Sequence, residues 1–274
     1  MCAVTVSRRS ALDRPGFPLC TVVWLADCRR ARLATPWSLS FNRRGNMSAP
    51  FKDRRDAGRA LARKLTEYAN DPAVVVLALP RGGVPVGYEV ALALRAPLDV
   101  FVVRKLGVPG YEEAAFGAIA SGGTRVLDPE VVAQLRLPNE MIDAVTRRER
   151  LELERREQLY RPDRPFVEVA ARTVILVDDG IATGASMYAA AEAIRLEHPE
   201  RLVIAAPVAS PAALRLLSKV ADDCVCVIAP EMLHAVGLWY EDFSQTTNEE
   251  VRSLLRDAGQ GTQPPRAPAT SLTS

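Results

Sequence analysis

The sequence predicts an α/β fold, a Rossmann-like parallel β-sheet flanked by helices. Short unbroken apolar runs rich in β-branched residues recur along the chain, as is typical of strands buried on both faces of a sheet. Between them, apolar residues recur at helical spacing, and strands that alternate with helices indicate βαβ units. The expected strands are 73–79, 98–103, 173–177, 202–208 and 224–228. The expected helices of this sheet are 53–68, 84–95, 184–197 and 211–220.

Composition excludes several classes of protein. The 274 residues are 48% hydrophobic and 25% charged, too apolar for a disordered chain. We expect no membrane span, because no stretch approaches about 18 uninterrupted apolar residues. The five cysteines include no CxxC pair, so a disulfide framework or zinc site is not indicated. His198 and His234 are the only histidines, which leaves no His-based triad or metal cluster.

The ends of the chain differ from its middle. Residues 1–46 hold eight arginines, no lysine and two aspartates, without helical or strand periodicity. Three interpretations stay open: a mis-assigned start with translation beginning at Met47, a targeting segment, or a genuine N-terminal extension. From residue 259 the composition is that of a disordered tail. One domain is therefore expected over 47–258, and its acidic balance gives no reason to expect nucleic acid.

Two segments interrupt the alternation of strands and helices. Residues 106–127 are Gly-rich, and GAIA at 117–120 and TRVL at 124–127 predict a mobile hairpin. Residues 129–161 form a helical insertion that carries as many acids as arginines from Asn139 onward. Balanced charge at i, i+3 and i+4 spacing is typical of a solvated, self-paired helix. A surface helix, a dimer arm and a lid over the site are all compatible with it.

The segment VILVDDGIATGAS at 174–186 carries the clearest chemistry. A strand ends in Asp178 and Asp179, whose carboxylates suit two vicinal sugar hydroxyls and a magnesium ion, directly or through water. A loop of small residues then enters a helix, where backbone N–H groups and the helix dipole bind phosphate. Capping acids at a helix start are the alternative, but burying two carboxylates costs desolvation. The expected phosphate-binding residues are Gly180, Ile181, Ala182, Thr183, Gly184, Ala185 and Ser186.

These residues resemble the signature of the type I phosphoribosyltransferases, and the resemblance extends over roughly 52–258. It implies transfer of a phosphoribosyl group from 5-phosphoribosyl-1-diphosphate (PRPP), with magnesium, to a nucleobase or related N-heterocycle. PRGGVP at 80–85 resembles the family's pyrophosphate loop, with a non-proline cis peptide flanked by Arg81 and Gly82 and with Gly83 beside them. Arg104 and Lys105 resemble its cationic contact to pyrophosphate. The hairpin at 106–127 then corresponds to the flexible catalytic loop that excludes water.

The acceptor is less well specified. Some purine-specific members place a third acid where this chain has Ala182, and adenine enzymes use a glutamate on the flexible loop. Glu112 and Glu113 match that glutamate, although solvated loop acids fit equally well. After the last strand, a hood at about 229–247 is expected. Its candidates for stacking on a flat base are Trp239, Tyr240 and Phe243.

The expected protein is a cytoplasmic, homodimeric enzyme whose ligands are PRPP and a small heterocycle, with no nucleic acid or membrane. A non-catalytic PRPP sensor is the main alternative. Such a sensor would need only Asp178, Asp179 and the loop that follows. Hydrolysis of PRPP is a third possibility, if the hood admits water.

Overall fold

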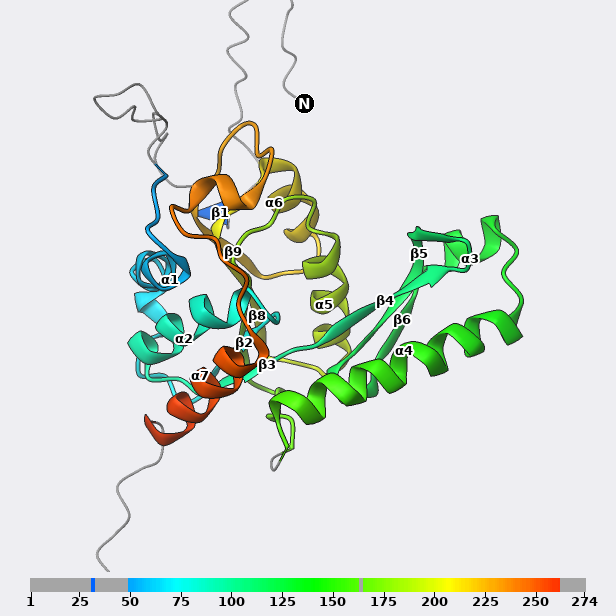
Figure 1. Cartoon of the computed structure of the whole chain (residues 1–274), viewed down its shortest axis with the longest axis horizontal. Coiled ribbons are helices and arrows are strands. Elements are labelled where there is room, and N and C mark those ends of the chain that lie inside the picture. Colours follow the sequence, from blue (N-terminus) through cyan, green and yellow to red (C-terminus); the bar gives the residue numbers. More distant parts are fainter. Residues whose placement is uncertain (1–30, 33–48, 163–164, 262–274) are drawn as a thin grey trace, which may run out of the picture.

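The computed structural model describes residues 31–32, 49–162 and 165–261 of the chain. Its body is a six-stranded sheet with the order β1-β9-β8-β7-β2-β3, in which all neighbours pair in parallel (Figure 1). This arrangement confirms the predicted α/β class. The strands are β1 (Ala31–Arg32), β2 (Val74–Ala78), β3 (Leu98–Val100), β7 (Thr173–Val177), β8 (Arg201–Val208) and β9 (Asp223–Ile228).

Helices cover both faces of this sheet, so alternate residues of its central strands enter different cores. In β2, Val74 and Val76 belong to the core beneath one set of helices, and Val75 and Leu77 to the core beneath the other. The first set is α1 (Arg54–Ala62), α2 (Gly83–Leu94) and α7 (Asn248–Gly261). The second set is α5 (Ala185–Leu196) and α6 (Pro211–Leu217).

The strand order changes direction between β2 and β7. From β2 the chain continues outward to β3, whereas from β7 it continues outward to β8 and β9 on the opposite side. The loops after β2 and β7 therefore emerge next to each other at the carboxyl edge of the sheet, before the chain continues in opposite directions. In parallel sheets, ligands bind at this switch point, outside the carboxyl ends of the strands.

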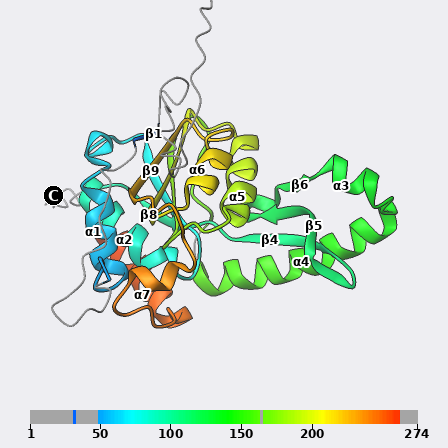
Figure 2. The same ribbon diagram turned by 90° about the horizontal axis from the view of Figure 1, so that it is seen from above.

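An arm extends from the body of the molecule (Figures 1 and 2). It consists of a three-stranded antiparallel sheet and two helices, the longer of which lies along the sheet. Its elements are β4 (Val103–Val108), β5 (Tyr111–Ala120), η2 (Ser121–Gly123), β6 (Arg125–Leu127), α3 (Pro129–Gln134) and α4 (Asn139–Tyr160). The predicted pairing of GAIA with TRVL is present as β5–β6, and the predicted helical insertion is α3 and α4.

Two predicted elements are corrected. The run 98–103 is not one strand, because β3 ends at Val100 and β4 belongs to the antiparallel sheet. Phe101 and Val102 join the two strands and are themselves buried, so hydrophobicity does not reveal the break. The helix predicted over 53–68 ends at Ala62 and is followed by the 3-10 turn η1 (Thr66–Tyr68). Leu65 is nevertheless buried on the predicted apolar side.

The C-terminal helix α7 was not among the expected elements. Val251, Leu254 and Leu255 bury its apolar face, and the Thr247 hydroxyl accepts a hydrogen bond from the Glu250 amide (3.1 Å). Thr247 and Glu250 have the spacing of a capping box, which is the local signal for this helix. The helix continues past the predicted boundary at 258, to Gly261.

The predictions for the ends of the chain fall largely on residues outside the described part. Within the segment 1–46 only Ala31–Arg32 is described, and the tail from 262 lies outside as well. None of the described helices is long and apolar enough to cross a membrane.

Candidate active site

Two loops lie side by side at the switch point of the sheet. The amide of Leu79, just after β2, donates to the carbonyl of Val177 at the end of β7 (2.9 Å). The first loop, 80–83, leads into α2, and the second, 178–184, leads into α5. Residues that sequence analysis placed in separate motifs therefore meet at one edge of the sheet.

The second loop is anchored in its middle and open near its end. The Ile181 amide donates to a carbonyl of β8 (2.9 Å), and the Ser210 hydroxyl donates to the carbonyl of Ala182 (2.6 Å). Gly184 has a φ of +81°, which glycine adopts without strain, and it directly precedes the first turn of α5. This end of the loop suits an anion. Its exposed residues are Ala182, Thr183, Ala185 and Ser186.

Asp178 and Asp179 follow β7 directly, and both are partly buried. The Asp179 amide donates to Oδ1 of Asp178 (2.9 Å). Burial raises the pKa of Asp178 well above its ordinary value, and the negative charge of Asp179 raises it further. Burial also raises the pKa of Asp179, but the hydrogen bond and charge of Arg54 oppose that rise. Adjacent carboxylates held together at such a cost are characteristic of a functional site.

The first loop packs directly on this acid pair. A Cβ atom added to Gly82 would lie 2.0 Å from Oδ2 of Asp179, and one added to Gly83 would lie 2.8 Å from the carbonyl oxygen of Val177. The loop does contain a non-proline cis peptide. It joins Pro80 to Arg81, which corrects the position between Arg81 and Gly82 expected from the sequence.

Arg54 is a component of the site that sequence analysis missed. Its Nε donates to Oδ2 of Asp179 at 2.8 Å, although the two residues lie 125 positions apart. The position of Arg54 after the helix cap Asp53 gives no local sign of this contact. The Tyr240 hydroxyl adds a second contact, donating to the main-chain carbonyl of Asp179 (2.5 Å).

The hood lies on the second loop, but its aromatic residues differ in their surroundings. Tyr240 is buried and packs against Phe51 and Phe243, with ring centroids 5.5 and 5.0 Å apart. It therefore supports the acid pair and is not open to a base. Trp239 is half-buried in the same apolar cluster, whereas Phe243 is 36% exposed.

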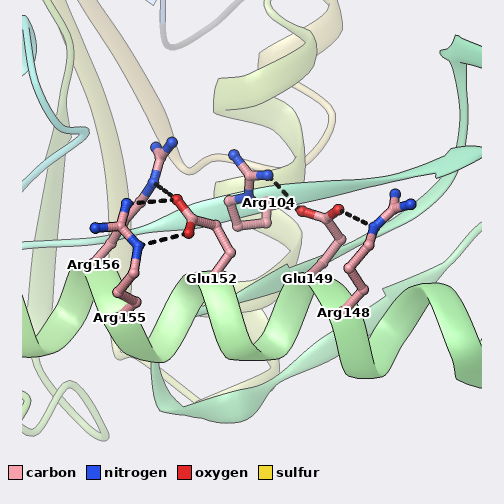
Figure 3. A network of polar contacts seen from close by, with 6 residues as sticks. All are labelled: Arg104, Arg148, Glu149, Glu152, Arg155 and Arg156. Carbon is pink, nitrogen blue, oxygen red and sulfur yellow. Dashed lines mark hydrogen bonds and ion pairs between the residues drawn. The ribbon is translucent and has the colours of Figure 1, made fainter.

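Arg104 and Lys105 lie within β4 rather than in a loop. Arg104 is paired with Glu149 of α4, with Nη2 and Nε at 2.6 and 2.9 Å from Oε2 (Figure 3). Successive side chains of a strand point to opposite faces, so Lys105, which is exposed, projects away from Arg104. Glu112 and Glu113 are part of β5, and their side chains lie outside the described part of the structure.

The charged helix α4 pairs with itself, as its sequence predicts. Glu152 accepts hydrogen bonds from Arg155 and Arg156, which lower the pKa of its carboxyl to about 2 (Figure 3). Glu149 also accepts from Arg148 (3.1 Å). Arg148, Arg155 and Arg156 thus each have a carboxylate partner on the same helix.

The oxygen donors of the site fit magnesium held mainly by a substrate. Asp178 and Asp179 are hard ligands, but Arg54 occupies Oδ2 of Asp179, and the described residues contain no cluster of three or more His, Cys, Asp or Glu side chains able to hold a metal. Magnesium commonly binds through one or two carboxylates, substrate phosphates and water. The acid pair can contribute to such a site without forming a complete cage.

A parallel sheet with a small-residue loop at a helix start and an acid pair at its switch point belongs to the class of α/β proteins that bind ligands at the carboxyl ends of their strands. A family model for the phosphoribosyl transferase domain matches residues 51–241, and the chain belongs to this family. The match includes both loops, the arm and most of the hood.

Individual relatives agree with this assignment. Proteins from two strains of Mycobacterium tuberculosis, CDC 1551 / Oshkosh and H37Rv, each named "Putative phosphoribosyl transferase", are 46% identical over 205 residues. The alignment covers 75% of this chain and 46% of each relative, so the chain matches about half the length of these proteins. The crystal structure of TT1426 from Thermus thermophilus is 44% identical, with a TM-score of 0.68, and is matched over 76% of this chain and 98% of its own.

Asp178→Asn should stabilise the protein at pH 7 while abolishing PRPP binding. The asparagine side chain keeps an oxygen that can accept from the Asp179 N–H, but it removes the repulsion between two negative charges. Single stabilising substitutions of this kind commonly raise the free energy of unfolding by about 0.5–2 kcal/mol. Because the pKa of Asp178 is raised in the folded state, its ionisation costs stability progressively as the pH rises from the ordinary aspartate pKa to the folded-state pKa, and fully above that. The gain in thermal unfolding temperature should therefore be largest above the folded-state pKa and shrink as the pH falls from there toward the ordinary aspartate pKa. Asp143→Asn, at an exposed carboxylate, is the control; a lower unfolding temperature for Asp178→Asn at pH 7 contradicts this account.

Gly82→Ala should weaken PRPP binding at least 10-fold in calorimetry while the circular dichroism spectrum is unchanged. The new methyl group needs the space of the Asp179 carboxylate, which Arg54 holds in place. Gly259→Ala is the matched control, because nothing lies within 4 Å of its added Cβ and alanine favours a helix. Equal PRPP affinities for the two variants would show that the contact between the loops is unimportant.

Proposed function

We propose that the protein transfers the 5-phosphoribosyl group of PRPP to a nitrogen of a nucleobase or related N-heterocycle and releases pyrophosphate. The observation that carries the proposal is the direct contact between the loop at 80–83 and the acid pair, with the open phosphate-type loop beside them. PRPP requires three recognition elements in one place, for its ribose hydroxyls, its 5-phosphate and its diphosphate. These loops supply one candidate for each.

In this assignment the acid pair accepts hydrogen bonds from the ribose hydroxyls, and backbone amides of the open part of the loop, 182–186, hold the 5-phosphate. The Ile181 amide does not contribute, because it is hydrogen-bonded to a carbonyl of β8. The loop at 80–83, with Arg81, Gly82 and Gly83, faces the diphosphate. Departure of the diphosphate leaves oxocarbenium character at the ribose, so fixed positive charge near the leaving group stabilises the transition state. Magnesium, when bound, neutralises charge on the diphosphate.

Lys105 is assigned to the leaving group more directly than Arg104. Lys105 is exposed, whereas the Arg104 guanidinium pairs with Glu149, whose side chain is only 9% exposed. Arg104 would have to exchange this carboxylate for a phosphate to act on the substrate. Glu112 or Glu113, from the same antiparallel sheet, is assigned as a proton acceptor from the base.

The hood supplies the acceptor side of the site. Val236 lies where a side chain on Gly180 would be, with Cγ1 2.3 Å from the position of an added Cβ, so the hood covers the beginning of the phosphate loop. Trp239 and Phe243 are the proposed stacking residues. The homodimer and the cytoplasmic location remain predictions from the sequence.

Incubating the full chain with PRPP, magnesium and each of a panel of nucleobases should give pyrophosphate release with at least one base. Release without any base would indicate hydrolysis. PRPP binding in calorimetry without release for any base would favour a sensor. Absence of PRPP binding would reject the proposal altogether.

Lys105→Ala should reduce turnover about 10²–10³-fold, as expected on removing one group that stabilises transition-state charge, while PRPP binding weakens much less. Lys219→Ala, at an exposed lysine after α6, is the control for loss of a surface charge. Turnover is measured as pyrophosphate release with the best base of the panel. Unchanged turnover would show that another residue serves the leaving group.

A further inference from the structure

Arg54 joins three parts of the molecule through one side chain. Its Nε contacts Oδ2 of Asp179 at 2.8 Å, and its Nη1 donates to the main-chain carbonyl of Ser244 at 2.7 Å. The centre of its guanidinium lies 3.9 Å from the centroid of the Phe243 ring. Arg54 is the first residue of α1, Asp179 belongs to the acid pair, and the other two residues belong to the hood. The side chain is only 12% exposed, and its contact with Asp179 is partly buried.

The position of Arg54 is fixed from the main chain. The segment 51–52 pairs with the hood: the Phe51 amide donates to the carbonyl of Trp239 (3.2 Å), and the Glu241 amide donates to the carbonyl of Phe51 (2.8 Å). The Asp53 side chain then caps α1 by accepting from the Asp56 amide (2.8 Å). A planar guanidinium held at this point can contact a carboxylate, a carbonyl and an aromatic face together.

The adjacent arginine, Arg55, does not share the contacts of Arg54 with the acid pair and the hood. Arg55 points to another element, where its Nε contacts Glu89 of α2 at 2.6 Å and its side chain is 51% exposed. The two arginines share a helix turn and charge but differ in burial and in the parts of the structure they join. Arg55 is therefore a matched control for the loss of an arginine from α1.

We propose that Arg54 is a positioning residue that fixes the Asp179 carboxylate for PRPP and couples it to the hood. This proposal rests on the proposed function. Arg54 occupies Oδ2 and so directs Oδ1 of the same carboxylate to the ligand. Through Ser244 and Phe243 it also holds the hood against the acid pair. Arg54 itself touches no reacting atom.

The two roles make different demands on the side chain. Fixing Asp179 requires a positive charge at the right distance, which a lysine can supply. Holding the hood requires the planar fork and its stacking on Phe243, which a lysine cannot reproduce. Substitutions at Arg54 should therefore separate PRPP affinity from the order of the hood.

Arg54→Gln should weaken PRPP binding about 10- to 100-fold, as is typical when a group that orients a ligand-binding side chain is lost. Arg54→Lys should recover most of that affinity. Calorimetry with PRPP and magnesium measures this effect for the full chain. Arg55→Gln should leave the affinity within about twofold of the unsubstituted protein.

The hood is monitored by the fluorescence of Trp239 in a background with Trp24→Phe and Trp37→Phe, which leaves it as the single tryptophan. Arg54→Gln, Arg54→Lys and Phe243→Leu should each raise the acrylamide quenching constant of Trp239 about twofold or more, without PRPP present. Arg55→Gln should not change it. Far-ultraviolet circular dichroism identifies any variant that fails to fold.

PRPP affinity and Trp239 quenching that are both unchanged in Arg54→Gln would overturn the proposal. If Arg54→Gln does not fold, Arg54→Lys and Phe243→Leu test the coupling to the hood in its place. Unchanged Trp239 quenching in both variants would overturn that coupling. Equal losses of affinity in Arg54→Lys and Arg54→Gln would refute the assigned role of charge. Absence of PRPP binding by the unsubstituted protein would refute the proposed function, and the quenching measurements would still test the hood contact independently.

Discussion

The repulsion between two adjacent carboxylates at the end of a buried strand is the constraint around which the site is built. Asp178 and Asp179 repel each other where solvent is largely excluded, and burial raises the pKa of both. Three neighbouring residues contact Asp179. Arg54 supplies a counter-charge, the Tyr240 hydroxyl donates to the main-chain carbonyl of Asp179, and Gly82 leaves space for the carboxylate. The helix α1, the hood and the loop after β2 therefore each contact the acid pair.

Topology makes this meeting possible. The change in strand order places β2 beside β7, so loops that are about 100 residues apart in the chain emerge next to each other. The loop after β7 has positive φ at Gly184, and the loop after β2 has no side chain at Gly82. The two glycines serve different purposes: Gly184 allows an unusual backbone conformation, and Gly82 allows close packing on a carboxylate.

Local patterns predicted most of the parallel sheet and both loops, since a buried strand, a helix start and a phosphate-type loop are encoded over about 5 to 15 residues. They could not predict which distant residues meet. The Arg54–Asp179 pair joins positions 125 apart, and nothing in the sequence around either residue specifies the other. The boundary between β3 and β4 was missed for a related reason: Phe101 and Val102 remain buried while the chain changes sheets. The helix α7 was predictable, because Thr247 and Glu250 have capping-box spacing.

The alternation of residues along β4 separates the two cations that the sequence places together. Arg104 faces α4, where the Glu149 carboxylate neutralises it and holds the small sheet to the long helix. Lys105 is on the opposite face and remains exposed. The two cations that are adjacent in the sequence therefore have different surroundings: Arg104 forms an ion pair within the protein, and Lys105 faces solvent. The Arg104–Glu149 pair thus links two elements within the arm, β4 and α4, and the lysine is left as the cation of β4 available to a ligand. At Asp179 an ion pair likewise holds one group in place: Arg54 contacts Oδ2, and in its proposed positioning role this contact leaves Oδ1 for the ligand.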